Sequence, residues 1–159
     1  MKIAVYPGSF DPITNGHLDI LQRSLKVFDK VILLLATNGS KKGRFAPEER
    51  LAMMKKSVKG IPGVEVDSYD GLTVEYCLRH DAKAIIRGLR AVTDFEYEFQ
   101  LSAANHYLSK EVDMVFFMAA PSTTFISSSA VDELAMNGAD IAALVPSCVA
   151  EAYSRKRGE

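Results

Sequence analysis

A histidine at the start of a predicted helix, in a loop rich in small residues, is the first feature of this sequence that could do chemistry. Residues 6–17 read YPGSFDPITNGH, so Gly16 directly precedes His17. Gly16 leaves room for a phosphate to approach backbone N–H groups, and the amino end of a helix adds positive potential. The alternative is a histidine that only caps its helix. The strand that ends just before the loop, and the glycine and serine around it, favour an anion site that includes His17.

Two arginines form a second candidate cluster. Arg87 and Arg90 follow an apolar run with Gly88 between them, and two guanidinium groups at the end of a strand suit phosphate oxygens. The alternative is that they form salt bridges with nearby acids, namely Asp94, Glu96 and Glu98.

A turn rich in hydroxyl groups is the third cluster. Residues 123–129 read TTFISSS and precede the apolar pair Ala130-Val131. Hydroxyls and backbone N–H groups at the start of a helix can bind phosphate groups. A helix cap with redundant serines is the alternative.

The elements that must position these clusters alternate along the chain. Apolar runs predict strands at 2–6, 31–36, 64–69, 84–87 and 114–119. Helical periods are predicted from Leu18 to Phe28, after Pro47, and over 73–81, 94–109, 129–137 and onward from Pro146. Repeated strand–helix units predict an α/β fold, a doubly wound parallel sheet, in one domain over residues 1–159. Ligands of such sheets bind beyond the carboxyl ends of the strands, and all three clusters fall in loops at that edge.

Composition narrows the classes of partner. The chain has 159 residues and a formal net charge of −1, so no global field attracts nucleic acid or an anionic membrane. Its short amino-terminal apolar run is too short for a signal peptide or a membrane span. Two distant cysteines form no metal-binding pattern, and no His/Cys/Asp cluster suggests a metal site built by the protein. We therefore expect a cytoplasmic protein.

The same segments resemble a known family. The pattern S-x-F-D-P-x-T-x-G-H is similar to the T/H-x-G-H signature of the nucleotidyltransferase superfamily, and the serine-rich turn resembles its second element. The string IRGLRAVTDFEYE at 86–98 resembles the distinctive segment of phosphopantetheine adenylyltransferases, and Ser40-Lys41-Lys42 extends the match. The resemblance covers nearly the whole chain. It implies a Rossmann-like fold and the transfer of AMP from ATP to 4'-phosphopantetheine, which yields dephospho-coenzyme A and pyrophosphate.

The resemblance also implies roles for individual residues. The implied catalytic residues are His17, Lys41 and Arg90. The implied ATP-binding residues are Ser9, Phe10, His17, Gly88, Leu89, Arg90, Glu98, Thr123, Thr124, Phe125, Ile126, Ser127, Ser128 and Ser129. The implied acceptor-binding residues are Ser9, Lys41, Thr73, Arg87, Leu101 and Asn105. Many family members have Thr in place of Ser9, and a bulkier apolar residue is often found in place of Thr73.

These roles describe a direct transfer without a covalent enzyme intermediate. His17 is expected to stabilise charge on the α-phosphate, and Lys41 to bring the donor and acceptor phosphates together. Arg90 and the serine-rich turn are expected to hold the β- and γ-phosphates. Magnesium is expected to arrive on the ATP phosphates and to keep its waters.

Two rival functions stay open at this point. One is another small nucleotidyltransferase, with nicotinamide mononucleotide or glycerol phosphate as acceptor, against which the segment at 86–98 argues. The other is a nucleotide-sensing module without catalysis, since a fold alone does not give a function.

The predicted helix at 94–109 has a further implication. Its apolar residues cover more than one face, which a single sheet cannot bury. We therefore expect a symmetric homo-oligomer, and the resemblance implies a hexamer built from two trimers. The alternative is that the carboxy-terminal helix from Pro146 folds over this surface.

Overall fold

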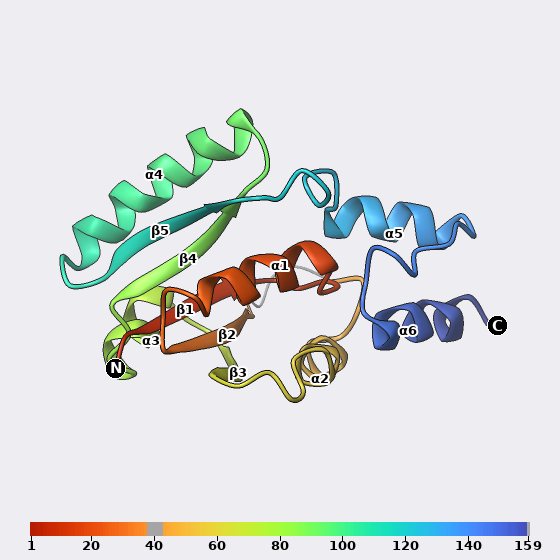
Figure 1. Cartoon of the computed structure of the whole chain (residues 1–159), viewed down its shortest axis with the longest axis horizontal. Coiled ribbons are helices and arrows are strands. Elements are labelled where there is room, and N and C mark those ends of the chain that lie inside the picture. Colours follow the sequence, from red (N-terminus) through yellow and green to blue (C-terminus); the bar gives the residue numbers. More distant parts are fainter. Residues whose placement is uncertain (38–42, 159) are drawn as a thin grey trace.

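The computed structural model describes residues 1–37 and 43–158, and its centre is a five-stranded parallel sheet (Figure 1). The strand order is β3-β2-β1-β4-β5, and every neighbouring pair is parallel. The strands are β1 (Ile3–Gly8), β2 (Lys30–Ala36), β3 (Val64–Tyr69), β4 (Ala84–Leu89) and β5 (Asp113–Met118). The chain adds strands outward from β1 in one direction and then resumes on its other side with β4. The predicted doubly wound sheet is confirmed, and its switch point lies between β1 and β4.

Helices connect the strands and cover both faces of the sheet. They are α1 (Asn15–Ser24), α2 (Pro47–Ser57), α3 (Thr73–Arg79), α4 (Val92–Leu108), α5 (Ser128–Met136) and α6 (Ser147–Arg157). Side chains of β1 alternate between two cores: Ala4 and Tyr6 pack with α1 and α2, and Val5 packs with α3 on the opposite face. α4 packs against β4 and β5, where Asn105 Nδ2 lies 3.1 Å from Met114 Sδ.

The carboxy-terminal helices lie together at one end of the molecule. α6 packs against α2 and α5, beyond the carboxyl ends of the strands, and α4 lies at the opposite side of the sheet (Figure 1). The alternative prediction, in which α6 covers the apolar surface of α4, is therefore wrong. Aromatic side chains of α4 stay exposed in this chain, with Tyr97 63% and Tyr107 90% accessible.

The predicted elements match the observed ones closely, and the differences lie at their ends. β1 extends to Gly8, because Pro7 and Gly8 pair with β2, and α4 begins at Val92. β4 extends to Leu89, so Gly88 and Leu89 belong to the strand rather than to the loop after it, because they pair with β5. α1 ends at Ser24, so Leu25 and Phe28 lie beyond it and pack on the core from the turn that leads into β2. Apolar spacing alone could not separate that turn from a last helical turn.

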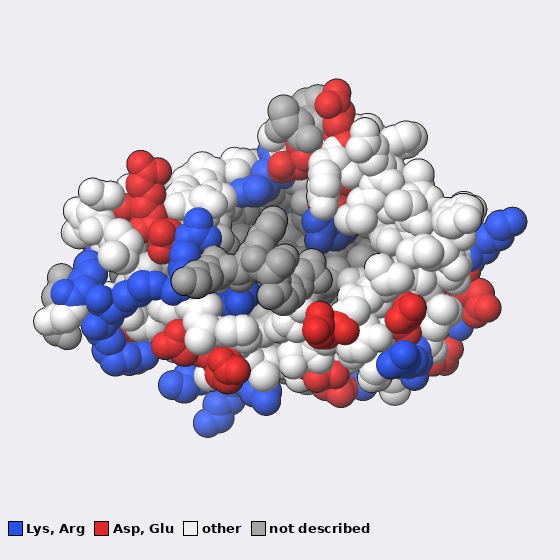
Figure 2. Space-filling view, turned by 180° about the vertical axis from the view of Figure 1, so that it is seen from behind, with Lys and Arg blue, Asp and Glu red and all other residues white. Residues whose placement is uncertain are grey.

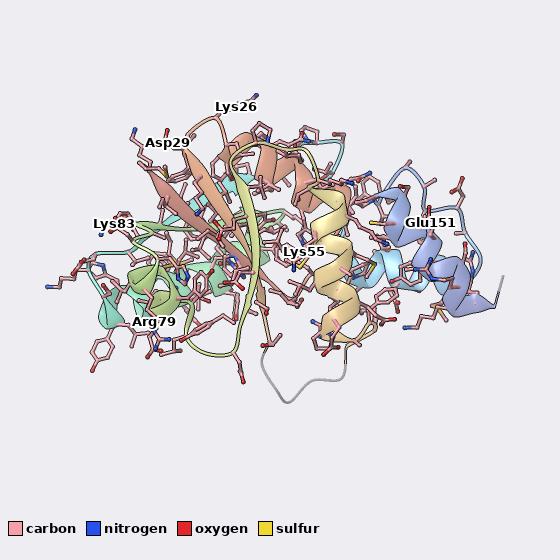
Figure 3. All side chains as sticks on the ribbon, turned by 90° about the horizontal axis from the view of Figure 1, so that it is seen from below. Lys26, Asp29, Lys55, Arg79, Lys83 and Glu151 are labelled. Carbon is pink, nitrogen blue, oxygen red and sulfur yellow. The ribbon has the colours of Figure 1, made fainter. Side chains whose placement is uncertain are left out.

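The amino ends of the strands are marked by charged side chains. Lys26 and Asp29 precede β2, Lys83 precedes β4, and Figure 3 shows all three at the same end of the sheet. Lys83 pairs there with Asp81 at 2.9 Å. The candidate residues for chemistry lie at the other end, as the strand-end rule predicts.

Candidate active site

A cavity of about 360 Å³ opens at the carboxyl ends of β1 and β4. It is lined by residues of β1, the β1–α1 loop and α1, by the end of β4 and the first turns of α4, and by the segment that leads from β5 into α5. Figure 2 shows a hollow on this molecule with Lys and Arg side chains at its rim. The cavity brings together predicted residues that are more than 100 positions apart in the sequence, which are Ser9, Phe10, His17, Gly88, Arg90, Glu98, Thr123, Ile126, Ser127, Ser128 and Ser129.

The start of α1 fixes the protonation state of His17. Thr14 caps the helix, and its backbone N–H donates to Nδ1 of His17 at 3.0 Å. In a neutral imidazole the nitrogen that accepts a hydrogen bond carries no proton, so the proton resides on Nε2. Burial, followed by the charges of Arg90 and Arg87, lowers the His17 pKa from 6.5 to about 4. His17 is therefore a neutral N–H donor at pH 7, and the predicted capping role and the predicted site role coexist in one side chain.

The start of α5 faces the same cavity and is tied to the β1–α1 loop. Ser127 caps the helix by accepting from the backbone N–H of Ala130 at 3.1 Å. The Ser128 hydroxyl donates to the carbonyl of Pro12 at 2.8 Å. The amino ends of α1 and α5 therefore face the same cavity, and the bond between Ser128 and Pro12 ties them together. Two helix amino ends in this position suit an anion.

Both arginines of the predicted phosphate cluster are paired with acids. Glu98 accepts from Nε and Nη2 of Arg87 at 2.6–3.0 Å, and its side chain is only 7% accessible. Arg90 Nε lies 3.7 Å from Asp94, which also accepts from the Arg90 backbone N–H at 3.1 Å. The salt-bridge alternative is thus realised, yet both guanidinium groups still line the cavity. Glu98 orients the Arg87 guanidinium by bidentate pairing, whereas Asp94 holds Arg90 mainly through its backbone N–H.

A second cavity of about 340 Å³ lies on the other side of the same strand ends. It collects the described residues predicted to bind the acceptor, namely Ser9, Thr73, Arg87, Leu101 and Asn105. The two cavities share the β1 turn and one side chain of β4: Pro7, Gly8, Ser9 and Arg87 line both. The donor and acceptor sets predicted from the sequence are therefore separated in space and meet at Ser9 and Arg87.

Some predicted residues do not join the cavities, and one lies outside the described residues. Leu89 is buried, whereas Thr124 and Phe125 are exposed on the turn before α5, and these three line neither cavity. Their roles in ATP binding, which the family resemblance implies, stay predictions. Lys41 belongs to residues 38–42, outside the described part of the chain.

Sequence reasoning missed a buried charged network behind the site. Both oxygens of the Asp11 carboxylate accept backbone N–H bonds, from Arg44 at 2.7 Å and from Phe45 at 2.9 Å. Arg50, 7% accessible, donates to the carbonyls of Ser9 and Phe45 at 3.0 Å each. These bonds fix the β1 turn against the start of α2. In the sequence, the F-D-P segment belongs to a motif, and nothing near it indicates its distant partners.

Tyr6 was also missed. Its ring lines the first cavity and contacts Phe10 edge-on, with centroids 5.6 Å apart. Burial raises the pKa of its hydroxyl. The ring therefore forms an apolar wall beside His17.

Within residues 1–37 and 43–158, no group of three His, Cys, Asp or Glu side chains could hold a metal ion. None of the helices described there is long and apolar enough to cross a lipid bilayer.

Comparisons with known proteins agree with this geometry. Residues 5–134 match the family model described as cytidylyltransferase-like. The chain is 53% identical over 153 residues to a phosphopantetheine adenylyltransferase of Dictyoglomus turgidum, covering 96% of each chain. It is 49% identical over 158 residues to proteins of the same description from Desulfosudis oleivorans and Roseiflexus sp., covering 99% of this chain and 94% and 99% of theirs.

Proposed function

The chain belongs to the phosphopantetheine adenylyltransferases, within the cytidylyltransferase-like proteins, and we infer from this membership what the cleft does. The protein is a nucleotidyltransferase of coenzyme A biosynthesis. It transfers AMP from ATP to 4'-phosphopantetheine and gives dephospho-coenzyme A and pyrophosphate. The observation that carries this function to the structure is the pair of cavities that meet at Ser9 and Arg87.

We assign ATP to the first cavity. Its anion-binding features lie at one end, where the amino ends of α1 and α5 converge with Arg90. A triphosphate fits such an array of N–H donors, hydroxyls and a guanidinium. The ATP-binding residues predicted from the family that line this cavity support the assignment.

We assign 4'-phosphopantetheine to the second cavity. Arg87 lines both cavities, whereas Thr73, Leu101 and Asn105 line the second alone. This arrangement suits a phosphate at the junction and an amide-bearing arm that extends away from it. Thr73 supplies a smaller and more polar wall there than the residue often found in the family.

The chemistry follows from the meeting of the two sites. An oxygen of the acceptor phosphate, an anion at neutral pH, attacks the α-phosphorus of ATP, and a new P–O bond forms. The bond from that phosphorus to the oxygen bridging to the β-phosphate breaks, and its electron pair leaves with pyrophosphate. Alignment and charge stabilisation supply the catalysis, because the nucleophile needs no strong base.

The protein residues act on the charge that develops. His17 Nε2–H is the donor proposed for the α-phosphate oxygens, and Nδ1 stays occupied by Thr14. Arg87, held by Glu98, is proposed to orient the acceptor phosphate, and Arg90 to hold the outgoing phosphates. Lys41 remains the predicted bridge between donor and acceptor phosphates.

Magnesium fits this site only as a companion of the nucleotide. The carboxylates of Asp94 and Glu98 in the first cavity already pair with arginines, so phosphate oxygens and water are the donors left for the ion. Bound there, it would neutralise charge on the β- and γ-phosphates.

We further propose that the chain assembles as a homo-oligomer, in particular a hexamer. We also propose that it acts in the cytoplasm. The exposed apolar side chains of α4 and the end of β5 support assembly: Phe95, Tyr97, Phe99, Tyr107, Leu108 and Met118. A surface of this kind usually marks an interface. Tagging the chain in cells and measuring its distribution tests the location.

One experiment separates the proposed function from its rivals. Pyrophosphate release from Mg-ATP is measured with 4'-phosphopantetheine, nicotinamide mononucleotide and glycerol 3-phosphate, each supplied alone. We expect release with the first acceptor only. Release with another acceptor would reassign the second cavity, and binding of ATP without release would leave a sensor.

A further inference from the structure

Arg44 is a cation that neither the motifs nor the family roles include, and its position is fixed by contacts on its backbone. Its N–H donates to Asp11 Oδ2 at 2.7 Å, and its carbonyl accepts from Lys156 Nζ. The preceding residue has to be glycine for this approach, since a Cβ on Gly43 would lie 2.7 Å from the same Asp11 oxygen. The start of α2 is thereby held against the β1–α1 loop.

The guanidinium of Arg44 reaches across to the start of α5. Nε lies 3.0 Å from Asp132 Oδ2, Nη1 donates to the Asp11 carbonyl at 3.2 Å, and Nη2 donates to Ser129 Oγ at 3.3 Å. Ser129 is exposed on the first turn of α5 and lines the first cavity. Through Ser129, Arg44 lies next to the first cavity. Its side chain keeps 33% of its surface accessible to solvent.

Three arginines around this cleft share one arrangement. Arg87, Arg90 and Arg44 are each paired with one carboxylate, from Glu98, Asp94 and Asp132 respectively. The first two line the cavity and are proposed to bind phosphates. In the third pair Asp132 contacts Nε, while the Asp11 carbonyl and the Ser129 hydroxyl hold Nη1 and Nη2. A phosphate bonded to the Ser129 hydroxyl would come within reach of Nη2.

We propose that Arg44 binds the terminal phosphate of ATP and, after transfer, the pyrophosphate product. This inference rests on the proposed function, because it needs the triphosphate to point toward α5. It adds to the site a residue that reaches the cavity only at Ser129, on the first turn of α5, where we place the outer phosphates. AMP, which lacks the outer phosphates, does not reach it.

The test compares ligands that differ only in those phosphates. Binding of α,β-methylene-ATP with magnesium and of AMP is measured by calorimetry for the wild type and for Arg44→Met. Loss of a partly exposed charge-assisted bond should raise the dissociation constant of the ATP analogue about tenfold and leave that of AMP within about twofold. The KM for pyrophosphate in the reverse reaction should rise by a similar factor, with the KM for dephospho-coenzyme A unchanged.

Controls separate this role from a structural one. Arg79→Met removes the same group from the last residue of α3 (labelled in Figure 3), which lines neither cavity, and should change none of these constants. Arg44→Gln keeps hydrogen-bonding groups near Asp132 without the charge, and should reproduce the effect if Arg44→Met does not fold. Equal weakening of AMP and of the ATP analogue, or no weakening of either, overturns the proposal. Failure of the proposed function would instead appear in the wild type, as no pyrophosphate release.

Discussion

The ring of His17 is bonded through Nδ1 to the backbone N–H of Thr14, 3.0 Å away, three residues earlier in the chain. This bond closes a capping box in which histidine takes the place usually held by Glu or Gln. It fixes the orientation of the ring and the nitrogen that carries the proton. The same contact therefore stabilises α1 and prepares a hydrogen-bond donor for the cleft.

Replacement of His17 should separate these two roles. His17→Gln keeps a side chain able to accept from the Thr14 N–H, so stability should stay near that of the wild type. Loss of the Nε2–H donor should lower kcat about 10²–10³-fold, with a far smaller change in the dissociation constant of ATP. His17→Ala should lose the same activity and also about 1 kcal/mol of stability. Normal turnover by either variant contradicts the assignment of His17. The control is His106→Ala, which replaces an exposed histidine on α4.

The low pKa of His17 predicts a pH dependence of stability. The folded protein binds this proton near pH 4 and the unfolded chain near 6.5, so between these values the unfolded state binds more protons. The contribution is fully present above pH 6.5 and is lost as the pH falls toward 4, by at most roughly 3 kcal/mol. Urea unfolding of the wild type and His17→Gln across this range measures it. The variant should lose less stability on acidification, and identical pH profiles would refute the shift.

Arg87 should act on the acceptor more than on ATP. Arg87→Ala leaves the buried Glu98 carboxylate without its partner, so some stability will be lost as well. Arg87→Lys keeps the charge but not the fork that Glu98 holds, and should raise the KM for 4'-phosphopantetheine about tenfold or more, against a smaller rise for ATP. Steady-state kinetics with each substrate varied measures both constants. An equal rise of KM for the two substrates would give Arg87 a shared role.

The same assignment makes a prediction about the substrate: pantetheine without its phosphate should be a very poor acceptor.

The exposed aromatic surface of α4 predicts assembly. Phe95 and Phe99 lie one turn apart with ring centroids 6.0 Å from each other, and both are more than half accessible. Sedimentation equilibrium at micromolar concentration should give a mass well above 17.5 kDa, and Phe99→Glu should lower it by placing a charge in the interface. Val27→Glu, at an exposed position before β2, should leave the mass unchanged. A wild-type species near 17.5 kDa refutes the oligomer, and a trimer refutes only the hexamer.

The fold and the two sets of candidate binding residues, for ATP and for the acceptor, could be predicted from the sequence because the patterns that indicate them lie within short segments. Buried parallel strands read as apolar runs, and the site residues cluster in the loops after them. The pairing of Arg87 with Glu98 was foreseen only as an alternative, because it depends on how α4 folds back eleven residues later. Contacts such as that of Asp11 with Arg44, 33 residues apart, depend on where two elements meet in space and have no signature in either segment.

The position of β1 in the sheet also affects how the chain acquires its site during synthesis. β2 can pair with β1 as soon as it leaves the ribosome, but the other edge of β1 waits for β4, some 75 residues later in the chain than β1 itself. Until then the central strand of the finished sheet has an open edge, the kind of surface that attracts other chains. The nascent protein is therefore most vulnerable to aggregation before β4 emerges. Its phosphate-binding cleft stays incomplete for longer still, until the serines that open α5 have been made.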